Sequence, residues 1–220
     1  MISDRLYTIG YSGFQIDEFI ETLKGYGISA VIDVRSNPYS GYFRDYDAEQ
    51  LRIRLRNSGI SYRNYAREFG ARHTDPAYFS HDGYLDFGVF AASTQFLDGT
   101  RKVVQGIEAG FVPVLMCAEK NPAACHRAIL VSRWFHENGY EVIHILPDGV
   151  TQSQDDVVNQ LKSAYFPNRA QLSFDNLNKT EDDYAREAYK IANEKIGYRE
   201  AAENSPDADP YYDFPDAAAI

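Results

Sequence analysis

The sequence predicts an α/β protein, with a mainly parallel sheet, helices on both faces, further C-terminal helices and an acidic tail. Short apolar runs rich in β-branched residues alternate along the chain with segments whose apolar residues recur at helical spacing. Residues 30–34 are almost continuously apolar, as in a strand buried on both faces. Strands separated by helices usually pair in parallel through right-handed crossovers, so this alternation predicts the fold class.

The first half of the chain is expected to contain three strands and two helices. Leu6 to Tyr11 is β-branched and aromatic and ends at Ser12-Gly13, as a strand does where it enters a tight turn. The other expected elements, in order, are a helix with Ile16, Phe19, Ile20 and Leu23 on one face, a strand at 30–34, a helix at 47–57 that begins at an Asp cap, and a short strand at 60–65.

The second half begins with an expected long loop at 66–86, which is uncommon in a compact domain unless the loop covers a site. The sequence then predicts a mostly helical segment at 87–109, broken near Asp98-Gly99. The remaining predictions are strands at 112–117 and 141–146 and helices at 123–138, 151–165 and 181–195.

Composition places the chain among ordinary globular proteins, with 220 residues, 44% hydrophobic and 25% charged. We expect an α/β domain over 1–150, a helical extension over 151–200 and an acidic, disordered tail over 201–220 that serves solubility or interaction. With two cysteines a disulfide framework is excluded. The absence of a leader or of an apolar run long enough to span a membrane predicts a cytoplasmic protein without a membrane partner.

Residues 35–72 carry eight arginines, four carboxylates and no lysine, together with seven aromatic residues. Guanidinium groups beside aromatic rings suit phosphate binding and base stacking, so this segment could contact a ligand or nucleic acid. The alternative is a solvated helix face, because Arg52, Arg54 and Arg56 lie opposite the apolar Leu51 and Leu55. The overall pI of about 4.9 opposes non-specific binding to duplex DNA.

Polar side chains follow several of the predicted strands, and in an open parallel sheet ligands bind at the carboxyl ends of strands. These side chains are Ser12, Asp33, Arg35, Cys117 and Glu119, with His144 inside the last strand. Cys125-His126-Arg127 falls in the expected first turn of the helix at 123–138, where free backbone N–H groups favour an anion. The sequence therefore predicts a site for a phosphate or carboxylate, with Arg35 and Arg127 as donors.

Three residues are candidates for catalysis, each with a structural alternative. Glu119 could act as a general base or pair with an arginine. Cys125 could be a thiolate nucleophile, or a small residue chosen for packing, as could Cys117. Asp33 could orient polar groups or form an ion pair with Arg35. A histidine such as His144 between two isoleucines is more often a hydrogen-bonded core residue than a ligand-binding one.

No metal site and no cofactor is assigned from the sequence. Cys117, Cys125 and His126 are potential zinc ligands, but the eight-residue separation of the cysteines is not the usual close spacing and the sequence shows no fourth ligand. The Gly10-Tyr11-Ser12-Gly13 stretch has the wrong spacing for a dinucleotide fingerprint and lacks the lysine of a nucleotide-triphosphate loop.

The chain contains a set of short motifs, namely Thr8-Ile9-Gly10-Tyr11-Ser12, Asp33-Val34-Arg35, Pro38 with Ser40, Gly59-Ile60 with Tyr62, Cys117-Ala118-Glu119, Cys125-His126-Arg127 and His144-Ile145. In this combination and order the motifs resemble the family called domain of unknown function 488. Where such proteins tend to show Leu-Gly-Gly-Arg, this chain has Phe69-Gly70-Ala71-Arg72, which keeps Arg72. The resemblance implies an α/β fold and a cytoplasmic protein, and it implies no reaction.

Three functions stay open on the sequence alone. The leading hypothesis is a pocket for a small anionic ligand, phosphate- or nucleotide-containing, with hydrolysis as the reaction. Its ligand-binding residues are Ser12, Arg35, Arg72, Cys117, His126, Arg127 and His144. The alternatives are a non-catalytic nucleic-acid or protein adaptor that uses residues 35–72, and a thiol redox protein that uses Cys125.

Overall fold

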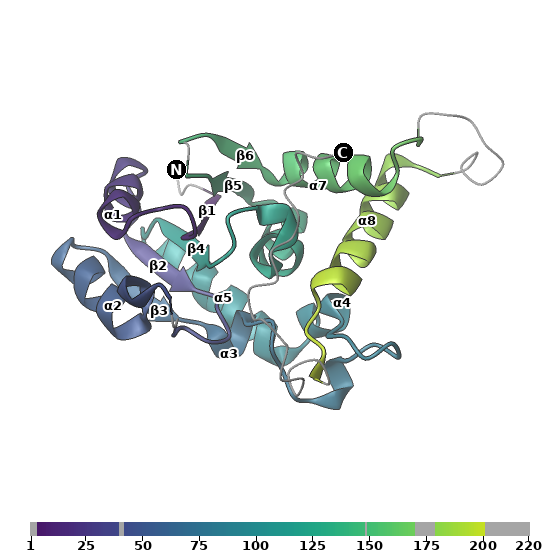
Figure 1. Ribbon diagram of the computed structural model, residues 1–220, viewed down its shortest axis with the longest axis horizontal. Coiled ribbons are helices and arrows are strands. Elements are labelled where there is room, and N and C mark those ends of the chain that lie inside the picture. The colour runs from purple at the N-terminus through teal and green to yellow at the C-terminus, as the bar shows by residue number, and fades with distance from the viewer. Residues whose placement is uncertain (1–3, 40–41, 148, 170–178, 201–220) are drawn as a thin grey trace.

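The computed structural model describes residues 4–39, 42–147, 149–169 and 179–200. The expected tail at 201–220 and Ser40 of the motif set lie outside the described residues. The fold is α/β, with a six-stranded sheet in the order β3-β2-β4-β1-β5-β6 (Figure 1). The strands are β1 (Arg5–Gly10), β2 (Ala30–Asp33), β3 (Ser61–Asn64), β4 (Pro113–Cys117), β5 (Glu141–Ile145) and β6 (Thr151–Ser153).

Five strands pair in parallel, as the alternation of strands and helices predicts. The sixth, β6, pairs antiparallel to β5 and was not predicted, because the sequence analysis placed its three residues in the following helix. Every residue of β2 and β4 is buried, which explains their continuous apolar character. The predicted parallel sheet is therefore confirmed, with one antiparallel edge strand added.

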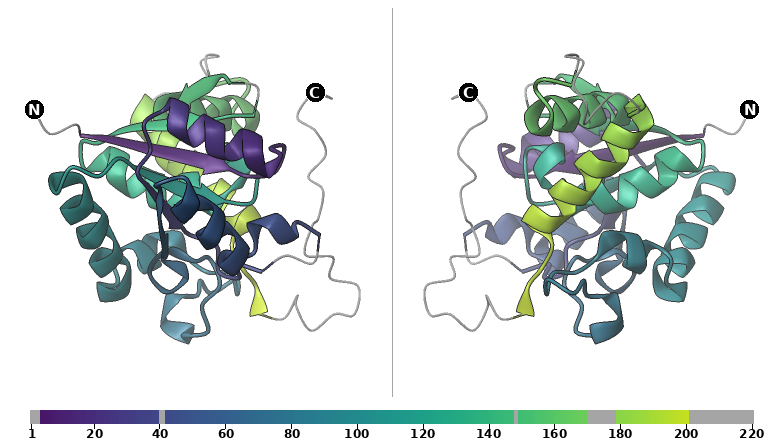
Figure 2. Two further views of the ribbon diagram at one scale, coloured as in Figure 1. Left: turned by 90° about the vertical axis from the view of Figure 1, so that its left-hand side faces the viewer. Right: turned by 90° about the vertical axis from the view of Figure 1, so that its right-hand side faces the viewer.

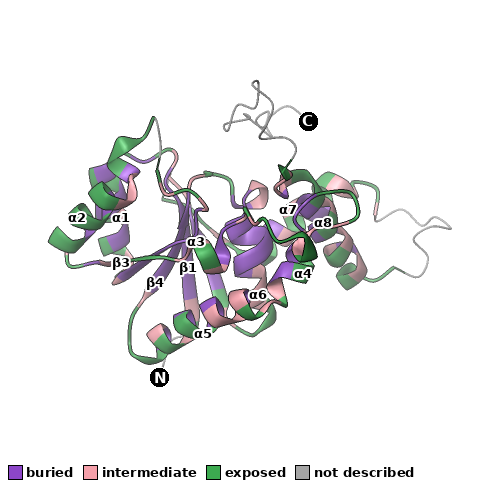
Figure 3. Ribbon diagram, turned by 90° about the horizontal axis from the view of Figure 1, so that it is seen from below, coloured by how far each residue is buried: buried purple, intermediate pink, exposed green. Residues whose placement is uncertain are grey.

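Helices cover both faces of the sheet, as Figure 3 shows. The α-helices are α1 (Ile16–Gly25), α2 (Ala48–Asn57), α3 (Ala66–Phe69), α4 (Phe87–Ala91), α5 (Thr94–Glu108), α6 (Arg133–Glu137), α7 (Gln154–Tyr165) and α8 (Glu181–Ile196). Short 3-10 turns lie at η1 (Arg44–Tyr46), η2 (Pro76–Tyr78) and η3 (Pro122–Ala124), and a π-helix lies at η4 (Arg127–Ser132). Helices α1 and α2 pack with one apolar cluster, and α4 to α8 pack with the other.

The two helices of the first face follow the predicted pattern. Helix α1 buries all four of the residues expected on its inner face. Helix α2 buries Leu51 and Leu55, while Arg52, Arg54 and Arg56 are exposed. The hydrophobic effect therefore orients α2 with its arginines toward solvent.

Residues 66–86 contain local structure that the sequence did not reveal, namely α3, η2 and a bridge between Phe79 and Leu85. The predicted helix at 87–109 is interrupted near Ser93, where the Ser93 side chain accepts a hydrogen bond from the Phe96 amide and starts α5. The expected break at Asp98-Gly99 is wrong. Gly99 lies inside α5, and a Cβ there would come within 2.6 Å of Glu68 Cβ and 2.8 Å of the Phe69 ring, so the glycine lets α3 pack closely on α5.

The C-terminal helices join the same core as the rest of the second face. Capping boxes at Ser153 and Thr180 begin α7 and α8. The Asn193 side chain of α8 accepts from the Phe87 amide and donates to the Leu85 carbonyl. In the right-hand view of Figure 2, α8 crosses obliquely in front of the sheet. No helix in the described part of the chain is both long and apolar enough to cross a membrane.

Candidate functional site

The sequence motifs meet at the carboxyl ends of β2 and β4, which are neighbours in the sheet. From β2 the chain continues to β3 at one edge, whereas from β4 it passes over β1 to β5 on the other side. Such a divergence is the topological switch point at which open α/β sheets bind ligands. Two clusters of polar side chains lie there, one that follows β2 and one that follows β4.

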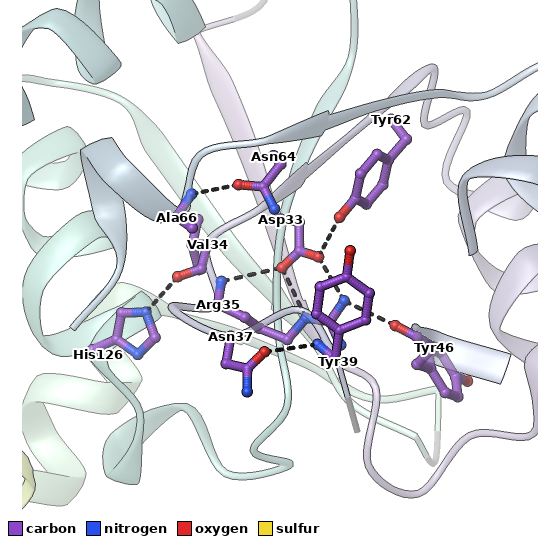
Figure 4. Close-up of polar contacts among 10 residues, drawn as sticks. All are labelled: Asp33, Val34, Arg35, Asn37, Tyr39, Tyr46, Tyr62, Asn64, Ala66 and His126. Carbon is purple, nitrogen blue, oxygen red and sulfur yellow. Dashed lines mark hydrogen bonds and ion pairs between the residues drawn. The ribbon is translucent and has the colours of Figure 1, made fainter. Parts of the chain in front are cut away.

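The cluster that follows β2 is centred on the ion pair between Asp33 and Arg35 (Figure 4). Arg35 Nε and Nη2 donate to the two carboxylate oxygens of Asp33, at 2.9 and 2.6 Å. The Arg35 amide and the Tyr62 hydroxyl also donate to this carboxylate, at 3.1 and 2.7 Å. Arg35 Nη2 further donates to the Tyr46 carbonyl, at 2.9 Å. Both side chains of the pair are buried.

The electrostatics of this first cluster keep Arg35 and Tyr62 protonated. Burial acts to lower the pKa of Arg35, but the ion pair with Asp33 outweighs it and raises that pKa. Burial and the neighbouring Asp33 raise the pKa of Tyr62, so its hydroxyl stays a donor. The Arg35 guanidinium also lies over the Tyr11 ring, 5.2 Å from its centre. In this network the Arg35 guanidinium and the Asp33 carboxylate are hydrogen-bonding partners of each other.

The cluster that follows β4 brings together Cys117, Glu119, Cys125 and His126. One potential metal-ligating atom from each lies within 4.8 Å of those of the others. Cys125 Sγ lies 2.9 Å from Glu119 Oε2, and Cys117 Sγ lies 3.8 Å from His126 Nδ1. His126 Nε2 donates to the Val34 carbonyl at 2.9 Å, so Nδ1 of a neutral His126 presents its lone pair to the thiols. We call these four residues the thiol cluster.

The four groups of the thiol cluster shift one another's protonation. Burial alone would raise the pKa of Cys125, but a hydrogen bond from Cys117, the charge of Arg127 and His126 hold it well below the ordinary value. Burial and the neighbouring Cys125 raise the pKa of Cys117 and of Glu119. Burial would lower the pKa of His126, yet Cys125 and Glu119 raise it. The pKa of each member of the thiol cluster thus depends on its neighbours.

Arg127 is fully buried and supports the loop of the thiol cluster. Its Nη1 and Nη2 donate to the carbonyls of Glu119 and Lys120, and its Nε donates to Thr8 Oγ1 at 3.4 Å. The loop lies against β1 so closely that a Cβ on Gly10 would stand 1.8 Å from the Glu119 carbonyl oxygen. Gly10 is needed for this close approach, and Arg127 holds the loop in place.

Cys125 lies in extended backbone with φ of −133°, between η3 and the π-helix η4. The expected helix start at Ala123 is therefore wrong, but His126 and Arg127 do lie in the first turn of the helical run, and the Cys125 carbonyl accepts from the amides of Ala128 and Ile129. The continuous helical run begins at His126, after the short turn η3, and the Arg127 amide donates to Cys125 Sγ at 3.4 Å. A π-helix is rare and often occurs at functional sites.

His144 lies inside β5, below the edge of the sheet, and is fully buried. Its Nδ1 and Nε2 are hydrogen bonded to Thr8 Oγ1 at 2.7 Å and Gln154 Oε1 at 2.8 Å. Gln154 in turn donates to the Tyr189 hydroxyl of α8, at 2.8 Å. Burial and the charge of Arg127 lower the pKa of His144 to about 3, so this histidine is neutral.

The remaining predicted residues lie at the rim of the edge. Ser12 is half-buried and its amide donates to the Ala118 carbonyl at 3.0 Å. Arg72 is exposed, and its amide donates to Ser36 Oγ at 3.0 Å. His73 was not among the predicted residues, and the centre of its ring lies 4.0 Å from that of Phe90. Burial lowers the pKa of His73, and the neighbouring His126 lowers it further. The one feature of the sequence that pointed to His73 is its place in the long expected loop at residues 66–86.

Residues 15–134 match the family model described as Domain of unknown function DUF488. Neither the curated proteins nor the solved structures contain a match to the chain. The matched residues cover more than half of the 220-residue chain and include both polar clusters at the sheet edge. The chain therefore belongs to the family Domain of unknown function DUF488.

Proposed function

We propose that this protein is a zinc-dependent hydrolase of a small anionic ligand and that the thiol cluster holds the metal. The observation that carries the proposal is the approach of four potential ligand atoms to within 4.8 Å of one another. Two thiolates and an imidazole nitrogen are ligands that zinc prefers over the harder cations. Glu119 supplies the fourth potential ligand atom of the cluster, and sequence spacing did not identify it as such because the sequence suggested a proton-transfer role for it.

The surroundings of His126 support a metal at this place. Histidines that ligate metals usually donate their second ring N–H to a carbonyl or carboxylate, which fixes the tautomer. The hydrogen bond from His126 Nε2 to the Val34 carbonyl is of this kind and leaves Nδ1 toward the thiols. Arg127 provides further support because it holds the carbonyls of Glu119 and Lys120. The ligand set thus rests on both β2 and β4.

The charges of the cluster also favour a bound cation. Cys117 and Cys125 are buried, and their sulfurs compete for protons with Glu119. A divalent cation compensates the charge of two thiolates and removes the need for shared protons, because metals displace protons from thiols on binding.

The anion would be recognised by exposed cations of the rim rather than by the two arginines named from the sequence. Arg35 and Arg127 are buried and donate to protein oxygens. Lys120 follows Glu119 and is exposed, as is Arg72 on the neighbouring loop. Lysine and arginine side chains in such positions suit a phosphate group.

Metal analysis of the purified protein tests the proposal. We expect one equivalent of zinc per chain, and at least about a tenfold loss of affinity in Cys117→Ser, Cys125→Ser and His126→Ala. His81→Ala is the matched control because His81 is fully exposed on another loop, and it should keep the metal. Zinc at 100 times its dissociation constant should stabilise the fold by about 2.7 kcal/mol. A protein that neither contains nor takes up zinc would contradict the proposal.

Thiol redox chemistry is a second candidate, favoured by the lowered pKa of Cys125 beside a second thiol. It predicts rapid alkylation of Cys125 at neutral pH in protein that holds no metal. Slow alkylation that becomes fast only after chelation would instead support the zinc proposal, because the metal would protect the sulfur.

A further inference from the structure

The metal would have an open side, because the four members of the thiol cluster differ in exposure. Cys117, Cys125 and His126 are buried, with 2%, 1% and 9% of their surface exposed. Glu119 as a whole residue keeps exposed surface, although its carboxyl group reaches inward to Cys125 Sγ. A metal held by the three buried residues would therefore face solvent on the side of Glu119. Structural zinc sites are closed by four protein ligands, and catalytic ones keep one position for water or substrate.

From these positions we infer that Glu119 is not a ligand but the proton-transfer group of an open zinc centre held by Cys117, Cys125 and His126. This inference rests on the proposed function and deepens it. Two thiolates and one neutral imidazole already balance the charge of a zinc ion, so the fourth position suits a neutral water molecule. A carboxylate bound there would add a negative charge and would block access of the substrate.

The backbone around Glu119 is held in place, as a proton-transfer group requires. The Glu119 carbonyl accepts from Arg127 Nη1, and the next carbonyl accepts from Arg127 Nη2. The Ser12 amide donates to the Ala118 carbonyl. At position 10 only glycine fits between β1 and the loop, because a Cβ there would collide with the Glu119 carbonyl. The carboxylate consequently starts from a fixed Cα and reaches the ligand atoms, since Oε2 lies 2.9 Å from Cys125 Sγ. Such preorganisation favours general acid–base catalysis.

The chemistry that fits is hydrolysis at a trigonal carbon with a nitrogen leaving group. Glu119 would take one proton from the water in the fourth position, and the remaining hydroxide would form a bond to the carbon. Glu119 would then return the proton to the amino nitrogen, the carbon–nitrogen bond would break, and an amine or ammonia would leave. The proton of the new hydroxyl group would move to the neighbouring ring nitrogen, so that a carbonyl forms. Zinc deaminases divide the work in the same way, with three nitrogen or sulfur ligands and a glutamate outside the coordination sphere.

The substrate class is then an anionic molecule with a hydrolysable amine on a trigonal carbon, such as a nucleoside monophosphate. Lys120 directly follows the proton-transfer residue and is exposed. The Arg72 amide donates to Ser36 Oγ at 3.0 Å, and Ser36 follows β2, so this loop lies near the same edge. Positive charge at the rim favours a phosphate there, while the trigonal carbon lies at the metal.

Cobalt substitution distinguishes a base from a ligand without knowledge of the substrate. Wild-type protein and Glu119→Gln are loaded with Co²⁺, and the affinity and visible spectrum of the two are compared. If Glu119 is a base and not a ligand, Glu119→Gln should bind Co²⁺ with an affinity within about threefold of wild type and with an unchanged spectrum. Added azide should then shift the wild-type spectrum, because azide enters the open fourth position. A tenfold loss of affinity in the variant, or no response to azide in wild type, would overturn the inference.

Ammonia release from adenosine and cytidine monophosphates then tests the reaction. We expect release by the zinc protein and a loss of about 100-fold or more in Glu119→Gln. Glu108→Gln is the matched control, because Glu108 is an exposed carboxylate at the end of α5, and it should keep both metal and activity. Absence of release from both nucleotides by wild-type protein would overturn the assigned substrate class. A chain that binds neither Zn²⁺ nor Co²⁺ would overturn the proposed function itself.

Discussion

Two polar clusters lie side by side at the sheet edge, and they differ in how completely their hydrogen bonds are satisfied. In the cluster that follows β2, the Asp33 carboxylate accepts four hydrogen bonds from Arg35 and Tyr62. In the thiol cluster, two sulfurs, a carboxyl group and an imidazole approach one another and shift one another's pKa values. The first arrangement suits a structural support, and the second suits a site that binds or reacts.

The largest expected effect is on the structural side of this comparison. Asp33→Ala leaves the Arg35 guanidinium buried without its partner, so we expect a loss of about 3–5 kcal/mol in the free energy of unfolding. Urea denaturation measures this loss. Tyr62→Phe is the milder control, because it removes one hydrogen bond and should cost about 1 kcal/mol. Equal stabilities of Asp33→Ala and wild type would show that the ion pair does not support the edge.

A pH-dependent effect is expected from His144 beneath both clusters. Its pKa in the folded protein is about 3, below the ordinary value of 6.5, so the unfolded chain binds the extra proton first. The stability that neutral His144 contributes is complete above about pH 6.5 and is lost as pH falls from there toward 3. The loss amounts to about 2 kcal/mol at pH 5.

Urea denaturation at pH 7 and pH 5 measures this contribution. His144→Asn should be less stable at pH 7 but should depend less on pH, because the titrating ring is gone. His81→Asn, which changes an exposed histidine, should keep the wild-type pH dependence. Identical pH dependence in wild type and His144→Asn would contradict the assignment.

A smaller stability effect is expected in the thiol cluster. Cys125→Ser replaces one small buried group by another, and we expect the metal-free protein to lose only about 1 kcal/mol. The same variant should lose the stabilisation that zinc gives the wild-type protein. Thermal unfolding with and without zinc measures both quantities. If Cys125→Ser destabilised metal-free protein as strongly as Asp33→Ala, the contrast between the two clusters would fail.

The smallest effect is expected on the exposed face of α2. Changing Arg52, Arg54 and Arg56 together to Ala should alter stability by less than about 0.5 kcal/mol per residue, because these side chains are exposed and their ion pairs weak. The adaptor hypothesis predicts that the same triple variant loses salt-sensitive binding to single-stranded nucleic acid. Binding of a labelled oligonucleotide by wild type and variant decides between a recognition surface and a solvated helix face.

Much of the fold could be predicted because periodicity and burial agree. Continuous apolar runs predicted β2 and β4, and apolar residues at helical spacing predicted α1. The structure has a strand or a helix, as predicted, at each of these places. Strand β6 was missed because three residues at a sheet edge carry too little pattern. Gly99 was misread as a helix break because its role is packing against Phe69, a contact that periodicity does not encode.

The site could be predicted only in part, for a related reason. The switch-point rule indicated the edge at which the two polar clusters lie, since the rule depends on strand order and not on side-chain detail. Whether a charged residue is a donor for a ligand or a partner within the protein depends on its local contacts. Arg127 was expected to bind an anion, and its nitrogens instead hold the carbonyls of Glu119 and Lys120. Glu119 lies beside the thiols because of the conformation of the loop that follows β4, which the sequence pattern does not reveal.

The central strand β1 lies outside the residues that the family model matches, although β4 and β5 both pair with it. Thr8 and Gly10 of β1 contact Arg127 and the Glu119 loop, so part of the support for the matched residues comes from the unmatched N-terminal segment. A chimera that transplants only the matched stretch from one relative into another would pair each thiol cluster with a foreign β1. Such exchanges should preserve β1 together with the loop if the recipient is to keep its site.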